Sequence, residues 1–404
     1  MPEAVIVAAA RTPIGRAGRG SLAECRPDDL AAFAVRSALA KIPELDPATV
    51  DDLYLGCGLP GGEAGFNMGR IVNILNDMDS VPASTVNRYC ASSVQTSRMA
   101  FHAIKAGEGE VFISAGVETV SRFANGTSDH LPNTQNPVFA PAAALTKEYA
   151  AGGRTWHDPR ADGHLPDAYI AMGQTAENVA RLKGLDRKEL DEFGVRSQNL
   201  TERAIAAGFW AREITPYSLS DGTVVRSDDG PRAGVSYDAV SQLQPVFRPD
   251  GVVTAGNCCP LNDGAAAVVI MSDGKAAELG TRPLARIVAT GVSGLSPEIM
   301  GLGPVEATRR ALAIAGMTIA DIDLVEINEA FAAQVVPSYQ ELGIDLDRLN
   351  VNGGAIAIGH PFGMTGARLQ GTLINSLDFH DKSTGLLTLC VGGGQGMAMI
   401  LERL

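Results

Sequence analysis

The sequence predicts an α/β protein whose two ends are built on a similar plan. Short apolar runs alternate with helical patterns near both ends, and 45 of the 404 residues are glycine, which suits tight turns between strands and helices. The pair Val86-Asn87 is followed by a candidate catalytic residue, a helix and a strand, and Val351-Asn352 is followed by the same succession. At this length the chain is expected to form two or three domains.

The first 119 residues contain clear elements. Pro27 and the two acidic residues after it favour a helix start, and Leu30 and Ala34 then share one face of that helix. The elements predicted here are a strand over 4–10, a helix over 27–39, a strand ending at 87, a helix beginning at 90 and a strand over 111–116.

Residues 120 to about 260 have a different character. They hold both tryptophans, loops rich in Asn, Pro and Asp, and one clear helical pattern over 174–182, so we expect an insertion with a small structure of its own. After residue 260 the alternation of predicted strands and helices resumes. The predicted elements are strands over 264–271 and 322–327, helices over 329–339 and 368–377, and two closing strands over 386–389 and 397–401.

Composition narrows the functional classes. Hydrophobic residues make up 45% and charged residues 20% of the chain, as in ordinary globular proteins. The net charge of −13 argues against a nucleic-acid or acidic-membrane ligand, although a local basic patch could still hold a small anion. There is no run of about 20 apolar residues, so no membrane span is expected.

The six cysteines predict free thiols rather than a disulfide framework or a metal site. There is no Cys-x-x-Cys pair and no Cys/His cluster at zinc spacing, so no metal is expected. A disulfide between the neighbours Cys258 and Cys259 would be strained. The first residues lack the basic leader and apolar core of a signal peptide, so a reducing, cytoplasmic compartment is expected.

Two glycine-rich stretches each contain one side chain that can transfer a proton. His360 lies in the stretch 353–363 and Cys390 in the stretch 389–396. Glycine lets a backbone approach a ligand closely and adopt positive φ. Cys90 is a third candidate, because a Cys nucleophile, a His that activates it and a second Cys that moves a proton form a coherent set.

Each candidate also has an ordinary structural interpretation. A lone cysteine is more often a small buried hydrophobe, and the stretch ending at Gly396 lacks the Lys-Ser/Thr of a P-loop. The joint occurrence of Cys90, His360 and Cys390 favours a catalytic role for them, because among six histidines only His360 lies among glycines. We also expect Cys90 to begin a helix, whose partly positive N-terminus would favour the thiolate and lower the pKa of the thiol.

Together these residues resemble the thiolases, the family of acyl-CoA acetyltransferases and 3-ketoacyl-CoA thiolases. The resemblance implies a thiolase-like fold, in which two similar βαβαβαββ halves stack in five layers (αβαβα) with an inserted loop domain. It also implies a homodimer or homotetramer. The matching motifs occur in order along the whole chain and include 5–13, 172–178, 254–257, 328–332 and 390–396. The implied division is an N-terminal half over 1–119 plus 261–283, the loop domain over 120–260 and a C-terminal half over 284–404.

The resemblance implies a ping-pong acyl transfer. Cys90 would attack the 3-keto carbonyl of a 3-ketoacyl-CoA, Cys390 would protonate the departing acetyl-CoA enolate, and free CoA would then take the acyl group. His360 matches the residue that activates the nucleophile and helps to bind the thioester oxygen. Asn328 matches the holder of an oxyanion-hole water, and the N–H groups of Cys90 and Gly392 match a second oxyanion hole. From its position alone, Asn328 could also be the N-cap of the following helix.

Coenzyme A is implied as a substrate, with acyl-CoA as the other partner and no permanently bound cofactor. An acidic protein needs local cations to hold this polyanion, and Arg232 matches a family position near the adenine and phosphates. Without the resemblance, Arg232 would be taken for a solvated loop residue. The other substrate contacts implied are Cys259, Leu261, Met172, Met300 and Phe331.

Three positions depart from the family pattern. Ser92-Ser93 stands where many members have Ser-Gly, Cys259 stands where Ser is frequent, and Ala171 stands where biosynthetic acetoacetyl-CoA thiolases commonly have His. The small Ala171 and the loop 229–232 favour a degradative enzyme for 3-ketoacyl-CoAs longer than acetoacetyl-CoA. The expected effect is modest, since one methylene in an apolar pocket is worth about 1–3 kcal/mol.

Three other functions deserve comparison. A ketosynthase of the same fold would need a His in the role given to Cys390. A noncatalytic acyl-CoA or lipid-binding protein would not need three reactive side chains. A biosynthetic acetyl-CoA acetyltransferase that makes acetoacetyl-CoA would use the same residues, and the dependence of activity on acyl chain length distinguishes it from a degradative thiolase.

Overall fold

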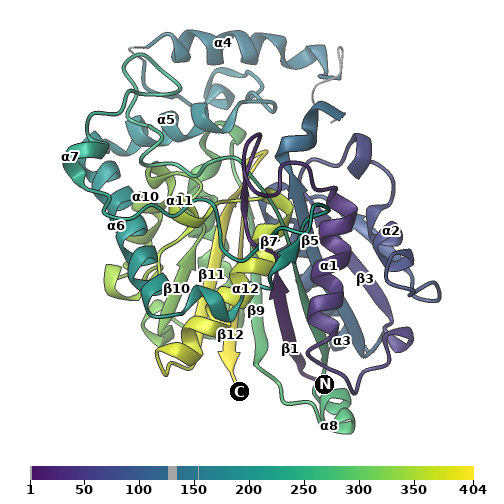
Figure 1. Cartoon of the computed structure of the whole chain (residues 1–404). Coiled ribbons are helices and arrows are strands. Elements are labelled where there is room, and N and C mark those ends of the chain that lie inside the picture. Colours follow the sequence, from purple (N-terminus) through teal and green to yellow (C-terminus); the bar gives the residue numbers. More distant parts are fainter. Residues whose placement is uncertain (1, 126–133, 153) are drawn as a thin grey trace.

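Five strands of the N-terminal half form a sheet in the order β1-β8-β5-β3-β4. The computed structural model describes residues 2–125, 134–152 and 154–404 (Figure 1). In this half β1 and β5 run antiparallel to β8, while β3 runs parallel to both β5 and β4. The strands are β1 (Ala4–Arg11), β3 (Asp52–Cys57), β4 (Ala83–Val86), β5 (Val111–Thr119) and β8 (Asn262–Ser272).

The C-terminal half repeats this order. Here β9 and β11 run antiparallel to β12, and β10 runs parallel to β11. A further parallel bridge from Val325 to Leu349 stands in the place that β4 has in the first half. The two similar halves expected from the sequence are therefore confirmed by the strand order. The strands are β9 (Ala285–Gly294), β10 (Leu324–Ile327), β11 (Thr384–Val391) and β12 (Gln395–Arg403).

The two sheets join at one edge. β1 and β9 pair antiparallel through Val5 with Arg286 and through Ile6 with Ala285, so the strands form one continuous sheet. Figure 1 shows the purple and blue strands of the N-terminal half beside the green and yellow strands of the C-terminal half. The first strand of each half thus lies at the junction between the halves.

Helices cover both outer faces and fill the space between the sheets. Because side chains alternate along a strand, Ile113 of β5 packs in an outer core with α1 and α2, and Phe112 packs in the inner core with α3. Likewise Ile400 of β12 packs with α9 and α10, and Met399 packs in the inner core with α12. The layers are α, β, α, β, α, as predicted. The helices are α1 (Pro27–Leu39), α2 (Met68–Ile74), α3 (Ser92–Ala106), α9 (Gly303–Ala315), α10 (Ala332–Leu342) and α12 (Phe362–Phe379).

The two central helices come close because α12 carries glycine where they meet. A Cβ on Gly366 would lie 2.3 Å from the backbone N of Val94, and one on Gly363 would lie 2.3 Å from a carbonyl oxygen of β5. The hydroxyl of Ser93 on α3 donates to the Gly363 carbonyl at 2.6 Å and accepts from the Ala367 N–H at 2.8 Å. The starts of α3 and α12 are therefore fixed relative to each other.

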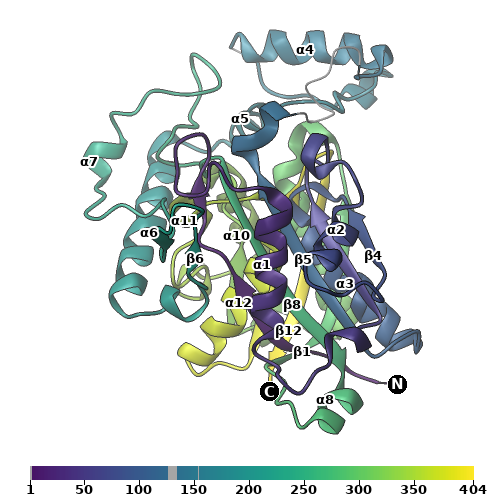
Figure 2. The same cartoon turned by 45° about the vertical axis from the view of Figure 1, so that its right-hand side comes forward.

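The segment between β5 and β8 adds helices on the outer side of the C-terminal half. Where the sequence predicted one helix over 174–182, the structure has α5 and the longer α6, and both contact α10. The helix α6 was missed because buried positions such as Gly194, Ser197 and Thr201 are small or polar, which interrupts the apolar stripe. Figure 2 shows α4 above the rest of the chain. The elements are α4 (Ala140–Ala150), α5 (Met172–Lys183), α6 (Arg187–Ala206), α7 (Tyr237–Val240), β6 (Tyr217–Ser218) and β7 (Val224–Val225).

Three predicted helix starts are wrong. The helix predicted over 368–377 is α12, which begins six residues earlier, at Phe362. Cys90 lies in a single 3₁₀ turn, and α3 begins only after it, at Ser92. The helix expected from residue 329 begins at Ala332, because Phe331 is extended and pairs with the segment before β8. β9 and α9 were not predicted.

Within the described residues no helix is long and apolar enough to cross a membrane. The remaining short elements include β2 (Gly15–Arg16), α8 (Asp273–Leu279) and α11 (Ala355–Ile358).

Candidate active site

Cys90 occupies a strained turn between β4 and α3. Tyr89, just before it, has a φ of 42°, a left-handed conformation that costs about 1–3 kcal/mol for a residue other than glycine. The Arg88 guanidinium donates to the side-chain oxygen of Gln395 at 2.7 Å, which ties this turn to the hairpin of β11 and β12. The turn thus holds a largely buried thiol, 8% exposed, in front of α3.

His360 occupies the corresponding place in front of α12. It precedes the first residue of its helix by two positions, as Cys90 precedes the first residue of α3. Its backbone N–H donates to Asn262 Oδ1 at 2.9 Å, and its ring packs edge-on against Phe362. Because α3 and α12 are fixed to each other, the positions of the thiol and the imidazole are fixed as well.

The tautomer of His360 follows from its contact with Thr365. The Thr365 hydroxyl donates its only hydrogen to the Pro361 carbonyl at 2.7 Å, so it accepts from His360 Nδ1 at 2.6 Å. Nδ1 therefore carries the proton, and Nε2 keeps its lone pair. Nε2 is consequently the ring atom that can take a proton from a nucleophile.

Asn328 faces this basic nitrogen. Its Nδ2 lies 3.3 Å from His360 Nε2, and its Oδ1 accepts from the Arg368 guanidinium at 3.3 Å. Because a guanidinium can only donate, Arg368 determines which end of the amide faces the imidazole. The N-cap of α10 is Phe331 and not Asn328, so the capping role considered from the sequence is wrong.

Cys390 lies near the end of β11, where a glycine turn leads into β12. Gly393 and Gly394 have φ values of 75° and 81°, which other residues rarely adopt. A Cβ on Gly392 would lie 3.1 Å from Tyr89 Cγ, so this turn packs against the turn that carries Cys90, and the N–H groups of Gly392 and Cys90 act to lower the pKa of the Cys90 thiol. The two residues that the resemblance implied as oxyanion-hole donors therefore belong to two turns in contact with each other.

Burial keeps the reactive groups neutral in the resting site. It raises the pKa of the Cys90 thiol to about 12, against the opposing effect of the Gly392 N–H, and holds the pKa of Cys390 well above its usual range. It lowers the pKa of His360 to about 3, with the charge of Arg368 as a second cause. The pKa of Cys90 is therefore raised and not lowered as expected, because desolvation by burial outweighs the backbone N–H groups that oppose it.

Cys259 packs against the hydrophobic cluster that contains Cys390. Burial raises the pKa of Cys259, and the charges that Cys258, Cys90 and Cys390 would carry as thiolates raise it further. Two neutral thiols and a neutral imidazole can exchange protons without a lasting ion pair. Such a set can form a thioester on one sulfur and move a proton with the other.

Four of the six residues implied for substrate binding gather beside Cys390. Met300 and Phe331 are buried in the same hydrophobic cluster as Cys390, and Met172 and Cys259 pack against that cluster. The structure thus brings together the start of α5, the loop before β8 and the residue before α10. These apolar side chains therefore pack in one hydrophobic cluster with the second thiol.

Arg232 and Leu261 lie outside that cluster. The Arg232 side chain is exposed, and its backbone N–H donates to the Gln198 side chain at 3.0 Å. The Leu261 side chain is 57% exposed. A Cβ on Gly230 would lie 2.2 Å from the carbonyl oxygen of Ala357 in α11, so the Arg232 loop packs beside the segment that leads to His360. Its guanidinium is accessible to an anion from solvent.

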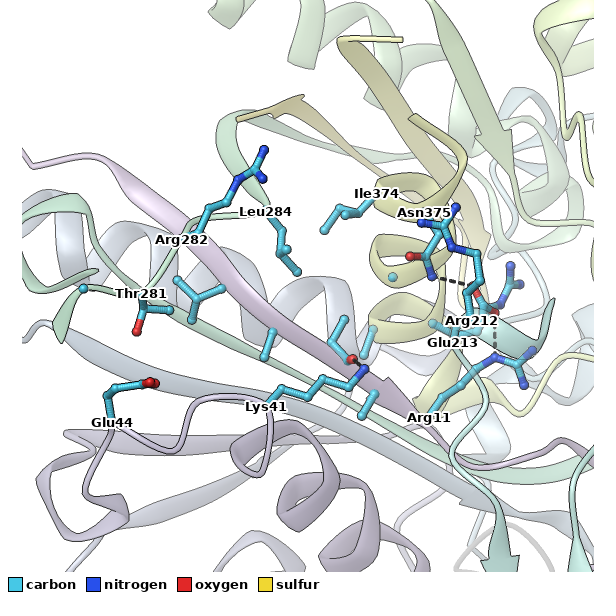
Figure 3. A pocket seen from close by; sticks show the side chains of 18 residues that line it. Arg11, Lys41, Glu44, Arg212, Glu213, Thr281, Arg282, Leu284, Ile374 and Asn375 are labelled. Atoms are coloured by element: carbon cyan, nitrogen blue, oxygen red, sulfur yellow. Dashed lines mark hydrogen bonds and ion pairs between the residues drawn. The ribbon is translucent and has the colours of Figure 1, made fainter. Parts of the chain in front are cut away.

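A cavity of about 460 Å³ lies elsewhere, between β1, α12 and the segment 280–284 (Figure 3). It is lined by none of the residues implied for chemistry or for CoA binding. Arg11, one of its charged residues, pairs with Glu213 at 2.6 Å and with Asp228 at 2.7 Å. The candidate site is therefore identified by its convergent reactive groups and not by the size of a cavity.

The sequence analysis missed the residues that orient the reactive groups. Thr365 and Arg368 lie on the first turns of α12, directly after His360, so helical spacing after a candidate catalytic loop could have indicated them. Asn262 begins β8, far from His360 in the sequence. No local pattern indicates such a contact, because it depends on how the two halves pack.

Comparisons with known proteins agree along the whole chain. The family descriptions "Thiolase, N-terminal domain" and "Thiolase, C-terminal domain" match residues 4–274 and 281–403. A 3-ketoacyl-CoA thiolase of Bacillus subtilis (strain 168) is 40% identical, with 100% of both chains covered. The 3-oxoadipyl-CoA/3-oxo-5,6-dehydrosuberyl-CoA thiolase of Escherichia coli (strain K12) is 42% identical, again with 100% of both chains covered.

A solved structure is similar over the same length. The crystal structure of the Bacillus anthracis acetyl-CoA acetyltransferase matches with a TM-score of 0.86 and 36% sequence identity. The match covers 100% of this chain and 99% of that one. This likeness confirms the fold class predicted from the sequence.

Proposed function

This chain belongs to the thiolase family, and we propose that it catalyses the CoA-dependent thiolysis of 3-ketoacyl-CoA to acetyl-CoA and a shortened acyl-CoA. The enzyme is an acyltransferase, and coenzyme A acts as a substrate without a permanently bound cofactor. One observation carries the proposal. Cys90 and His360, which keeps its lone pair on Nε2, precede two helices that the Ser93 hydroxyl joins, and a Cβ on Gly392, two residues after Cys390, would lie 3.1 Å from Tyr89 Cγ in the Cys90 turn.

The first half-reaction forms an acyl-cysteine. The Cys90 thiol gives its proton to His360 Nε2, and the sulfur attacks the 3-keto carbonyl of the substrate. The bond between the α and β carbons then breaks, which leaves the acyl group on Cys90 as a thioester and releases the acetyl-CoA enolate. The Cys390 thiol protonates the enolate carbon, so acetyl-CoA departs and Cys390 is left as a thiolate.

The second half-reaction restores both cysteines. The thiol of a free CoA gives its proton to the Cys390 thiolate and attacks the acyl-Cys90 thioester. The Cys90 sulfur leaves and takes back the proton held by His360. The N–H groups of Cys90 and Gly392 stabilise the negative oxygen of one tetrahedral intermediate, and Asn328 holds a water that stabilises the thioester oxygen of the enolate.

Substrate binding uses two kinds of surface. The apolar cluster of Met172, Met300, Phe331 and Cys259 contacts the pantetheine and acyl chain. Leu261, which is 57% exposed and lies outside that cluster, offers an apolar contact at the surface. The Arg232 guanidinium binds the phosphate end of CoA, which an acidic protein can hold only with a local cation.

The acylated residue is the direct test of this proposal. After brief exposure to an acyl-CoA, mass spectrometry of tryptic peptides is expected to place the acyl group on Cys90. Cys90→Ala is expected to lose the label, while Cys258→Ala, which removes a nearby thiol, keeps it. Acylation of Cys390 with Cys90 left free would overturn the assignment.

A biosynthetic acetyl-CoA acetyltransferase is the second candidate, because the similar crystal structure is described as an acetyl-CoA acetyltransferase. We favour thiolysis of longer substrates, since the N-cap of α5, directly before Met172, is the small Ala171, where biosynthetic acetoacetyl-CoA thiolases commonly have His. The test is kcat/KM for thiolysis of 3-ketoacyl-CoAs from four to twelve carbons. A steep maximum at four carbons would favour the biosynthetic candidate.

The chain is proposed to act as a homodimer or homotetramer. β4 is the outermost strand of the N-terminal sheet, and all four of its residues are partly exposed. Unpaired strand edges readily pair with another chain. Phe66 and Ile74, 76% and 51% exposed, precede β4 along the chain. Light scattering across a dilution series measures the oligomeric state, and a persistent monomer would contradict the proposal.

We propose that the enzyme works in the reducing cytoplasm. All six cysteines are free, and the chemistry assigned to Cys90 and Cys390 requires both sulfurs in the thiol form. Thiol labelling of the protein in intact cells provides the test. Quantitative oxidation of these cysteines in cells would contradict the proposal.

A further inference from the structure

Glu118 is a buried carboxylate at the end of β5 that the steps above do not use. It is 2% exposed. Its Oε2 accepts the N–H of Gly58 at 2.8 Å and the N–H of Gly363 at 2.9 Å, while Oε1 accepts the N–H of Leu59 at 3.2 Å. The Cys57 thiol donates to Oε1 at 3.8 Å. One side chain thus satisfies three backbone donors.

These donors belong to both halves of the molecule. Gly58 and Leu59 follow β3, whereas Gly363 is the second residue of α12, just after His360. The first N–H groups of a helix have no partner within it, and a negative charge is stabilised there. A Cβ on Gly58 would lie 2.8 Å from Oε2 and 2.9 Å from the Phe362 Cβ, so glycine is what permits this close contact.

The loop after β3 that Glu118 holds lies against the turn of the nucleophile, because a Cβ on Gly58 would also lie 3.5 Å from the backbone C of Tyr89, and the charge of Glu118 raises the pKa of Cys90. The groups that can titrate around the carboxylate are Cys57 on β3 and Cys90 before α3. Glu63 and Arg122 line a small cavity beside it and pair with each other at 2.6 Å. From α12 and from the loop after β3, Glu118 accepts only backbone N–H groups.

We propose that Glu118 is a positioning residue for the thiolase reaction: it holds the start of α12, and with it His360, in register with the turn that carries Cys90. This inference rests on the function proposed above. The Ser93 hydroxyl of α3 donates to the carbonyl of the same Gly363 whose N–H Glu118 accepts, so α3 and the carboxylate hold one residue of α12 between them. A misplacement of about 1 Å can cost roughly 10²-fold in rate, so a loosened contact slows proton transfer between the two groups.

The test compares Glu118→Gln with a matched control, Glu177→Gln. Glu177 is also a buried carboxylate, and it accepts the N–H groups of Val252 and Val253 at 3.1 and 3.0 Å, but it lies on α5. Both variants are expected to lose similar thermal stability, because each turns one acceptor oxygen into a donor that faces N–H groups. Glu118→Gln alone is expected to slow acylation of Cys90 by about 10–10²-fold with less than about a 2-fold change in KM.

Alkylation of Cys90 by iodoacetamide provides a readout that a purely structural role does not move. Removing the charge of Glu118 lowers the pKa of the thiol, so the alkylation profile of Glu118→Gln is expected to move to lower pH even though acylation is slower. The profile of Glu177→Gln is expected to coincide with that of the wild type. Opposite effects on alkylation and on acylation identify a positioning role beside the nucleophile.

Two results would overturn the inference. One is wild-type acylation by a Glu118→Gln protein that is destabilised as much as Glu177→Gln. If Glu118→Gln does not fold, Gly58→Ala takes its place, since its methyl group displaces the carboxylate without removing the charge. Wild-type acylation by a folded Gly58→Ala protein is the second. A wild-type enzyme that never acylates Cys90 would instead contradict the proposed function.

Discussion

The segments in front of α3 and α12 occupy corresponding places in two halves with the same strand order, yet they carry different chemistry. Cys90 and His360 each precede the first residue of their helix by two positions. The backbone plan is therefore shared, and the identity of one side chain decides which half supplies the nucleophile and which supplies the base. A repeated scaffold provides two neighbouring helix starts that can be specialised independently.

The surroundings of the two segments differ as well. The pKa of Cys90 is lowered by backbone N–H groups, its own and that of Gly392, against the larger effect of burial, whereas His360 is oriented by the side chains of Thr365 and Asn328. Burial raises the pKa of the thiol and lowers that of the imidazole, so both are neutral at rest. The comparison teaches that the nucleophile depends on backbone geometry and the base on individual side chains. The predictions below test this difference.

The largest effect is expected for His360→Ala. His360 takes the proton of Cys90 in the first half-reaction and returns it in the second, so both half-reactions are expected to slow by about 10²–10⁴-fold. Rapid mixing with 3-ketoacyl-CoA, and separately of acyl-enzyme with CoA, measures them. His380→Ala at the other end of α12 is the control and is expected to leave both rates near wild type. Loss of one half-reaction only would contradict the shared role.

Cys390→Ala is expected to slow the protonation and formation of the acetyl-CoA enolate, while acyl transfer to Cys90 continues. Acylation of Cys90 by an acyl-CoA should continue, while exchange of the α-protons of acetyl-CoA and condensation fall by about 10²–10⁴-fold, because no thiol remains to move that proton. Deuterium exchange into acetyl-CoA and mass spectrometry of the enzyme measure the two reactions. Near wild-type exchange in this variant would exclude Cys390 as the acid–base group.

Thr365→Val is expected to reduce kcat about 10-fold, because it removes the hydroxyl that keeps the proton of His360 on Nδ1. It leaves a buried donor unpaired, which costs about 1–3 kcal/mol of stability. Thr96→Val is the matched control on α3, where the hydroxyl bonds Ser93 and Ser114. Equal losses of kcat in both variants would show that the effect comes from stability and not from the tautomer.

The smallest effect concerns the pH dependence of stability. The pKa of His360 falls from 6.5 to about 3 on folding, so below pH 6.5 the unfolded chain takes up a proton that the folded chain does not. Stability is therefore lost as the pH falls from about 6.5 toward 3, by at most roughly 1.4 kcal/mol per pH unit from this group. Urea unfolding between pH 4 and 8 should show a shallower loss for His360→Asn. Parallel curves would contradict the neutral, buried imidazole.

In the same urea-unfolding experiment, Glu118 is expected to change stability with pH in the direction opposite to that of His360. Its pKa rises from 4.5 to about 7 on folding, because burial penalises the charged form. Its contribution to stability is therefore fully present below pH 4.5 and is lost as the pH rises through 7. The stability difference between wild type and Glu118→Gln should thus fall as the pH rises from about 4.5 to 7, whereas the difference between wild type and His360→Asn should grow as the pH rises to about 6.5.

Local patterns predicted much of the framework. The helix over 27–39 was predicted with the bounds that the structure gives α1, because Pro27 and the apolar spacing are short-range signals. The helix α6 escaped the same reasoning, since Gly194 and Ser197 on its buried face give no hydrophobic signal. The start of α10 was misplaced because Phe331 pairs with a segment distant in the sequence.

The sequence by itself determined which side chains are reactive and which loops are glycine-rich, because these properties belong to single residues and their neighbours. Only the tertiary structure decided that the Cys90 thiol is neutral, which nitrogen of His360 carries the proton and that Glu118 joins the two halves. Hydration and hydrogen bonding depend on groups that are far apart along the chain, as with Glu118 and Gly363, which are 245 positions apart. Packing of the two central helices brings such groups together, and no local pattern records it.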